Sequence, residues 1–238
     1  MGLFGRLLKP RESELLQRVR AGAKAGDVVA QRGLGAMYIE GNLLPQNYPV
    51  AAAWYAMAAA QDDEKALYVL GEMYIQGLGV IHDEGQAEEL LTCAAEKGYV
   101  PAEVSLAGLL DRQRRHAEAN AWWECAAKAG HVAAAYNVGC SFNEGVGAEH
   151  DPARALFWFT RAAELGHADA QFNLAKRLAT GEGIDKDEIA AHAWLTVSLG
   201  QRDDADTVRL RAAVERRLAP EQIARANELA ATLKQPTA

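Results

Sequence analysis

Pairs made of a large apolar residue followed by a small one recur along this chain of 238 residues. The intervals between successive pairs are 36, 36, 32 and 36 residues. Self-similarity at a fixed period of this length is typical of stacked repeats, each one supersecondary unit long. The pairs are Leu34-Gly35, Leu70-Gly71, Leu106-Ala107, Val138-Gly139 and Leu174-Ala175.

A second column of large residues confirms this register independently. Its intervals are 36, 32, 36 and 36 residues, so the unit that is four residues short loses them between Ala107 and Trp122. The intervals therefore predict five units, of which the third is irregular. The column consists of Trp54, Leu90, Trp122, Trp158 and Trp194.

Each unit is predicted to be two helices joined by a loop. The first helix, for example Ala66 to Gln76, ends at a glycine that suits the left-handed conformation after a helix C-terminus. The second begins at a short polar residue, whose side chain can accept hydrogen bonds from the free amides of the first turn. The glycines are Gly41, Gly77, Gly145 and Gly181, and the capping residues are Asn47, Asp83, Asp151 and Asp187.

Three segments depart from the regular unit. In the third unit, residues 112–115 (Arg-Gln-Arg-Arg) replace the glycine loop and cap, which predicts a tighter corner between its two helices. Residues 13–25 resemble the second helix of an incomplete leading unit. After Gly200, residues 203–218 and 220–234 read as two amphipathic helices that would close the last open face.

Alanine accounts for 48 residues, and much of it falls in columns. Paired alanines, such as Ala94-Ala95 and Ala162-Ala163, let stacked helices approach to roughly 8 to 10 Å. The tryptophan column is predicted to fill the core of the second helices, and Tyr38 and Tyr74 the end of the first ones.

Charge and composition restrict the function. Residues 1–26 carry a net charge of +4, residues 201–238 carry +1, and the segment between them carries −12. An acidic body argues against nucleic-acid binding. The longest apolar run, Val50–Ala60, has 11 residues and is too short to insert across a membrane. Three unpaired cysteines and no secretory leader predict a cytoplasmic protein.

The motif Leu70-Gly71-x-x-Tyr74-x-x-Gly77-x-Gly79-Val80-x-x-Asp83, followed by Ala-Ala-x-x-Gly98, resembles the Sel1-like repeat, a relative of the tetratricopeptide repeat. The resemblance covers about residues 27–200. It implies an all-α, right-handed superhelical α-solenoid with helical caps, and a non-enzymatic adaptor or scaffold that binds a protein or peptide segment in its concave groove. The expected division is a basic cap at 1–26, repeats at 27–62, 63–98, 99–130, 131–166 and 167–200, and C-terminal capping helices at 201–238.

Motifs for other chemistry are weak. The Gly-x-Gly pairs lack a following Gly-Lys-Ser/Thr, the six histidines are spread along the chain, and the serines lack Ser-x-x-Lys or Gly-x-Ser-x-Gly. We therefore predict no cofactor, metal or catalytic residue. Two alternatives stay open. One is a cell-wall or β-lactam hydrolase, by analogy with a cysteine-rich branch of the same family; the other is a structural protein that self-associates.

The candidate site lies on the first helices, on the side away from the leucine column. Residues two before and two after each column residue point there, since successive helical residues are 100° apart. Stacked asparagines can bond both the N–H and the C=O of an extended peptide. A second interpretation is that these residues only tie adjacent units together. The candidate peptide-binding residues are Arg32, Tyr68, Glu72, Tyr136, Asn137, Cys140, Phe172, Asn173 and Lys176.

Overall fold

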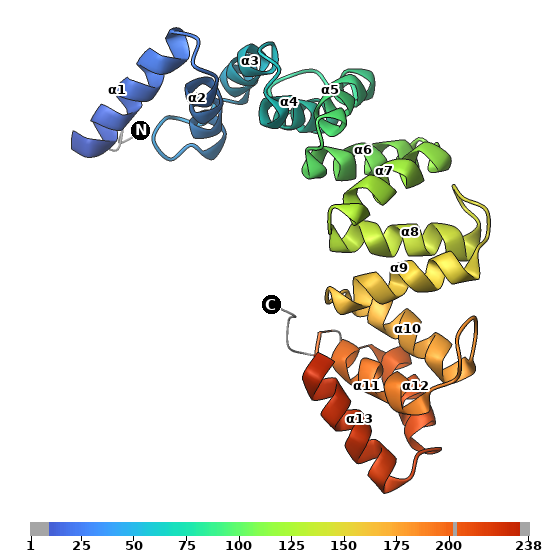
Figure 1. Ribbon diagram of the computed structural model, residues 1–238. Coiled ribbons are helices and arrows are strands. Elements are labelled where there is room, and N and C mark those ends of the chain that lie inside the picture. The colour runs from blue at the N-terminus through green and yellow to red at the C-terminus, as the bar shows by residue number, and fades with distance from the viewer. Residues whose placement is uncertain (1–9, 202–203, 234–238) are drawn as a thin grey trace. The chain divides into compact units, whose positions relative to one another are not determined.

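Antiparallel helical hairpins follow one another along the chain (Figure 1). The computed structural model describes residues 10–201 and 204–233, and every regular element within these ranges is an α-helix. This confirms the predicted all-α class. The chain divides into two compact units, Met1–Leu109 and Leu110–Ala238.

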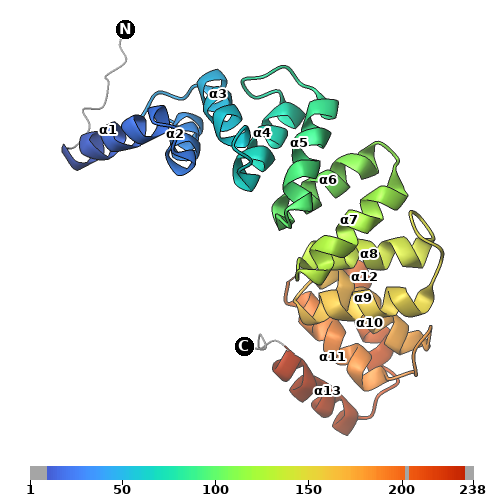
Figure 2. The same cartoon turned by 45° about the horizontal axis from the view of Figure 1, so that its top comes forward.

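In the first unit, each helix packs on the next from α1 to α5. The helix predicted over residues 13–25 is present and begins slightly earlier. Figure 2 shows α2 with α3 and α4 with α5 as successive hairpins. The helices are α1 (Pro10–Lys24), α2 (Val28–Glu40), α3 (Tyr48–Ala59), α4 (Glu64–Gln76), α5 (Glu84–Glu96) and α6 (Val100–Arg112), whose last residues belong to the second unit.

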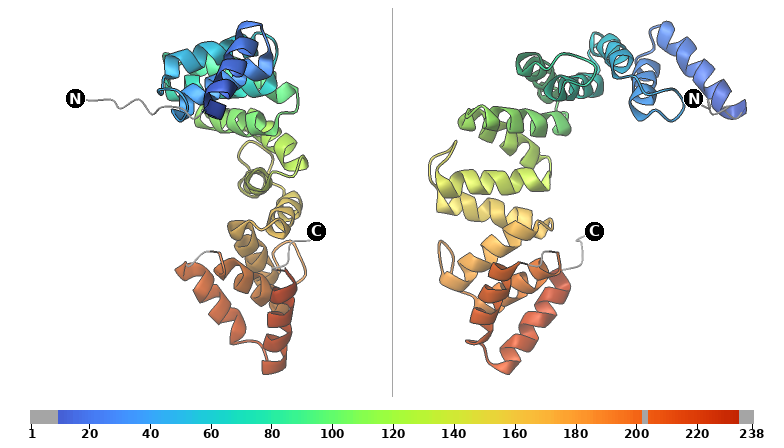
Figure 3. Two further views of the ribbon diagram at one scale, coloured as in Figure 1. Left: turned by 90° about the vertical axis from the view of Figure 1, so that its left-hand side faces the viewer. Right: turned by 180° about the vertical axis from the view of Figure 1, so that it is seen from behind.

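In the second unit, α7 to α11 stack in the same way, and α11 also carries both C-terminal helices. Figure 3 shows α13 lying alongside α11. The predicted ends at 203 and 234 lie outside the described residues. The helices are α7 (His116–Lys128), α8 (Val132–Glu144), α9 (Pro152–Glu164), α10 (Ala168–Thr180), α11 (Glu188–Leu199), α12 (Ala205–Glu215) and α13 (Pro220–Leu233).

The predicted loop chemistry is confirmed in the four regular hairpins. The loop glycines end the first helices with φ between 66° and 79°. Each predicted capping side chain accepts a hydrogen bond from a backbone amide of the second helix. Asp151, for example, accepts from the amides of Ala153 and Arg154. The Asp151 amide also donates to the carbonyl of Phe142, which closes the loop. Local backbone demands therefore explain these columns.

A second capping column, at the start of the first helices, was missed. Asp27 and Asp63 cap α2 and α4, and at the same register His131 and His167 cap α8 and α10 through the Nδ1 atom. Each Nδ1 atom accepts a hydrogen bond from the backbone amide three residues later, at 3.2 Å for His131 and 3.4 Å for His167. These two histidines therefore have a structural role.

The irregular third hairpin has the predicted tight corner. Only residues 113–115 separate α6 from α7, and Arg114 adopts a left-handed φ of 62°. Arg115 is the N-cap residue but makes no side-chain capping bond. Its guanidinium instead pairs with Glu118 at 2.7 and 2.8 Å.

The core partly corrects the sequence prediction. All five residues of the leucine column are buried, and so are Trp158 and Trp194, but Trp54 and Trp122 are only half-buried. The small residue of the first helix instead packs against the residue that follows the tryptophan-column residue in the sequence. A Cβ built on Gly139 would lie 2.7 Å from the Phe159 ring. The equivalent pairs are Gly35 with Tyr55 and Gly71 with Leu91.

The second glycine of two loops lies directly against the backbone of the neighbouring hairpin. Gly147, on the loop after α8, lies directly against the carbonyl group of His116 at the start of α7. Gly79, with the same left-handed φ, lies in the same way against the backbone of Tyr48 and Pro49. In these two loops the Gly-x-Gly pair is thus a helix end followed by a close contact between the backbones of adjacent repeats.

Candidate peptide-binding site

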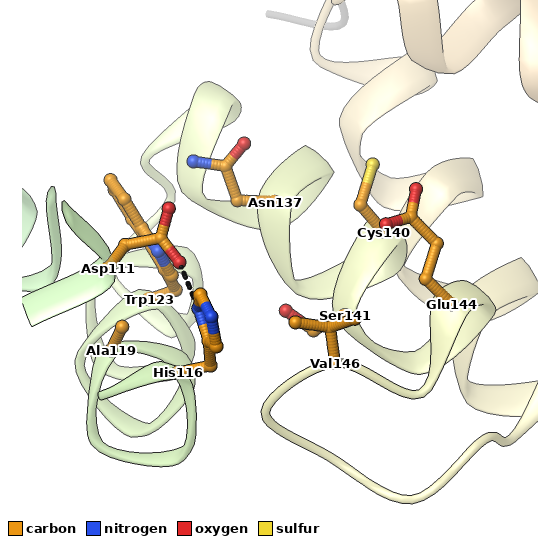
Figure 4. Close-up of a pocket in the computed structure, with 9 residues that line it drawn as sticks. All are labelled: Asp111, His116, Ala119, Trp123, Asn137, Cys140, Ser141, Glu144 and Val146. Atoms are coloured by element: carbon orange, nitrogen blue, oxygen red, sulfur yellow. Dashed lines mark hydrogen bonds and ion pairs between the residues drawn. The ribbon is translucent and has the colours of Figure 1, made fainter. Parts of the chain in front are cut away.

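A pocket of about 290 Å³ opens in the second unit, between α8 and the preceding hairpin (Figure 4). Two of its residues, Asn137 and Cys140, belong to the predicted site. We call it the α8 pocket. It is lined by Asp111, His116, Ala119 and Trp123 on one side and by Asn137, Cys140, Ser141, Glu144 and Val146 on the other.

Carboxylates and an indole ring dominate the α8 pocket. The Asp111 carboxylate meets Nδ1 of His116 at 2.7 Å across the tight corner (Figure 4). Glu144, at the end of α8, adds a second, exposed carboxylate. Burial raises the pKa of the Cys140 thiol, so it stays protonated near neutral pH. A pocket of this charge favours a ligand that is cationic or rich in hydrogen-bond donors.

Asn137 has no hydrogen-bond partner for its side chain within the described ranges. It is half-buried and faces the open space of the pocket (Figure 4). Asn173, at the same register one repeat later, lies close enough to the Tyr136 hydroxyl to lower the pKa of that group. The residue that corresponds to Tyr136 one repeat earlier is Val104, which has no hydroxyl. The two stacked asparagines therefore differ in what they can offer a ligand.

Three predicted site residues instead connect adjacent repeats. Arg32 pairs with Asp63, the N-cap of the next hairpin. The rings of Tyr68 and Tyr99 lie 5.4 Å apart. Arg32 and Tyr68 occupy the same position in successive repeats. Each contacts the residue that precedes the first helix of the next repeat, Asp63 or Tyr99.

Tyr136 makes the equivalent contact with His167. Their rings stack at 4.4 Å with an interplanar angle of 13°. Burial is the main cause of the raised pKa of Tyr136, followed by the nearby Cys140. This column therefore contributes to the connection between repeats, as the second interpretation proposed.

The remaining predicted residues are more open. Lys176 is exposed on α10, Phe172 is half-buried, and Glu72 accepts from the Gln76 side chain at 3.3 Å. Sequence reasoning missed the pocket residues Asp111, His116, Trp123, Ser141 and Glu144. The signal that could have found them is a comparison of the same columns in successive repeats.

The partly buried position of His167 against Tyr136 predicts that the stability of the second unit depends on pH. Burial lowers the pKa of His167, with Asp169 opposing the shift, and its Nδ1 must stay unprotonated to cap α10. The unfolded chain therefore binds the proton more tightly, and the free energy of unfolding falls as pH drops below the ordinary value of 6.5. Above that value this contribution is fully present.

Urea titrations between pH 5 and 7.5 measure this effect. His167→Asn keeps a capping acceptor without a titrating ring, so its free energy of unfolding should depend less on pH than that of the parent. An identical slope for parent and variant would contradict the assignment.

A smaller cavity of about 120 Å³ repeats the arrangement one hairpin later. We call it the α10 pocket, and it contains Asn173 and Lys176 of the predicted site. It is lined by Asn143, Phe159, Asn173, Lys176, Arg177 and Glu182.

Other chemistry has little geometric support. The Asp111–His116 pair resembles an oriented general base, but no hydrogen bond joins His116 to Ser141 in the part of the chain that the structure describes. Over these same residues, no group of three or more histidine, cysteine, aspartate or glutamate side chains could hold a metal ion. None of the described helices has the length and apolar character needed to cross a membrane.

Five stretches of the chain match the family model "Sel1 repeat", at residues 28–63, 64–99, 106–131, 132–167 and 168–197. Together they cover more than half of the sequence. The chain belongs to the Sel1 repeat family. Sel1 repeat proteins are generally scaffolds for protein interactions, and the fold is typically non-catalytic.

Two curated relatives share part of this repeat region. "Chitin synthase regulatory factor 3" of Schizosaccharomyces pombe is 35% identical over 107 residues, 44% of this chain and 11% of that protein. "Alginate biosynthesis protein AlgK" of Azotobacter vinelandii is 39% identical over 82 residues, 34% of this chain and 17% of that protein. The alignments thus span only a small part of each relative's length.

Solved structures confirm the fold. A Sel1 repeat protein from Oxalobacter formigenes matches with a TM-score of 0.72 and 27% identity, over 82% of this chain and 85% of that one. The protective antigen c5321 of uropathogenic Escherichia coli matches with a TM-score of 0.59 and 24% identity, over 94% and 57% of the two chains. The Sel1 and tetratricopeptide-like solenoid predicted from the repeat columns is therefore the fold of this chain.

Proposed function

We propose that this Sel1 repeat protein is a non-enzymatic scaffold that holds an extended segment of a partner protein against its first helices. In this proposal residues 27–200 form the five repeats, and the flanking helices are the caps. The observation that carries the proposal is the pair of equivalent cavities on α8 and α10. Each one contains two of the predicted site residues at the same register.

The proposed site uses seven of the nine candidate residues in two ways. Asn137, Cys140 and Lys176 line space that a ligand can enter. Asn173 lines the α10 pocket and also lies near the Tyr136 hydroxyl. In the first unit, Arg32, Tyr68 and Glu72 occupy the corresponding side of their helices, where Arg32 and Tyr68 also connect repeats.

Peptide binding should depend on the two asparagines. Octapeptides are selected on an array with the purified protein, and their affinities are measured for the parent and for Asn137→Ala with Asn173→Ala. We expect the double substitution to weaken binding about tenfold or more, because it removes side-chain hydrogen bonds to the peptide backbone.

The matched control is Asn227→Ala, an exposed position on α13 away from both pockets. It should leave affinity unchanged. A folded double variant that binds the selected peptides as tightly as the parent would exclude this surface as the site.

A further inference from the structure

The α8 and α10 pockets are the same crevice in two successive repeats. Adding 36 to a residue number of α7, of α8 or of the loop after α8, or 32 to a residue number of α6, relates one pocket to the other. Six lining positions correspond in this way. The pairs are Asp111 with Asn143, Trp123 with Phe159, Asn137 with Asn173, Cys140 with Lys176, Ser141 with Arg177, and Val146 with Glu182.

Arg177 explains why the α10 pocket is the smaller one. Its side chain is buried, and its guanidinium donates to the Asn143 side chain and, at 3.4 Å, to the carbonyl of Glu182. The guanidinium carbon lies 5.7 Å from the centroid of the Phe159 ring. The α10 crevice is therefore a guanidinium site that the chain fills with its own arginine.

In the α8 pocket the filling residue is missing, and the carboxylate stands at a different position, because Val146 replaces Glu182, whose carboxylate lies 3.7 Å from the Arg177 guanidinium. Ser141 stands in place of Arg177, which leaves about 290 Å³ open where the other pocket has about 120 Å³. Asp111 replaces the neutral Asn143 with a carboxylate. Trp123 replaces Phe159, and an indole attracts a cation more strongly than a phenyl ring.

We infer that the α8 pocket binds the guanidinium group of an arginine supplied by the partner segment. This inference rests on the proposed function, since it names one side chain of the bound peptide. Asp111 accepts from the guanidinium, and Trp123 offers its ring face. Arginine suits the site better than lysine, because its planar donors match a carboxylate and stack on a ring. Anionic side chains are repelled by Asp111 and Glu144.

The test uses short blocked peptides as probes. Ac-Ala-Arg-Ala-NH2 is titrated into isotope-labelled protein, and the indole N–H signal of Trp123, assigned with Trp123→Phe, is followed by NMR. We expect a saturable shift, and binding at least tenfold weaker for the citrulline peptide, which has the same shape without the charge. Equal affinity for both peptides would overturn the inference.

Two reciprocal variants localise the binding. Ser141→Arg should fill the α8 pocket as Arg177 fills its own, and should abolish the Trp123 shift in a folded protein. Ser141→Lys is the matched control for charge alone. Arg177→Ser should empty the α10 pocket, so that a second peptide binds there. Retained peptide binding by folded Ser141→Arg protein would overturn the inference even if Arg177→Ser proves unstable.

The outcome is separable from that of the proposed function. If peptides without arginine bind as well as those with it, and binding still needs Asn137 and Asn173, the scaffold proposal stands and the arginine inference fails. If the arginine peptide binds while no octapeptide depends on the asparagines, the reverse holds.

Discussion

Replacing Gly147 with alanine should destabilise the second unit by about 3 kcal/mol. Gly147 has a φ of 77°, where an L-residue is strained by about 1 kcal/mol or more. In addition, the new Cβ would overlap the carbonyl group of His116. That group is backbone at the start of α7, so it cannot rotate away as a side chain can. The loop must lift off the preceding hairpin.

Gly145→Ala is the matched control. Gly145 has a φ of 71°, but a Cβ there would meet the Cβ of His150 at an ordinary 3.4 Å. It should cost only the strain of the left-handed backbone, about 1 kcal/mol. Chemical denaturation gives both values, and Gly147→Ala should also lower Tm by roughly 10 °C. Equal losses for the two variants would show that the contact with His116 contributes nothing.

The helical hairpins could be predicted because their determinants are local and recur in columns. A left-handed helix end needs glycine, and a helix start needs a short acceptor, so residues such as Gly145 and Asp151 mark each loop in the sequence. The histidine caps were missed because imidazole is an uncommon capping group. Only the register shared by His131 with Asp63 reveals its role.

The binding site was less predictable, because it depends on contacts about 30 residues apart. The asparagine column did lead to both pockets. What surrounds each asparagine, however, depends on its repeat: Asn173 lies near the Tyr136 hydroxyl and lowers its pKa, whereas Asn137 lines the α8 pocket. Likewise, Ser141 opens a pocket only because Arg177 fills the equivalent one. Such differences become informative once the packing of neighbouring repeats is known.

The interior of the fourth hairpin should resist even one added methyl group. Gly139 on α8 faces Phe159 on α9, and a Cβ would lie 2.7 Å from the ring. Alanine favours the helix by up to about 1 kcal/mol, but overpacking a fixed ring costs about 1–3 kcal/mol. Phe159 is itself buried, so its ring can shift only toward the small α10 pocket that it lines. We expect Gly139→Ala to destabilise the protein by about 2 kcal/mol.

The fifth hairpin suggests how to rescue this variant. It carries Ala175 and Leu195 at the equivalent positions, and both are buried. A branched aliphatic side chain is thus compatible with alanine there, so Phe159→Leu should recover part of the stability lost by Gly139→Ala. A double-mutant cycle measured by urea unfolding should show a coupling of about 1 kcal/mol or more between the two positions. Additive losses would mean that the glycine column is not set by the facing side chain, and that the helices of a hairpin approach closely for another reason.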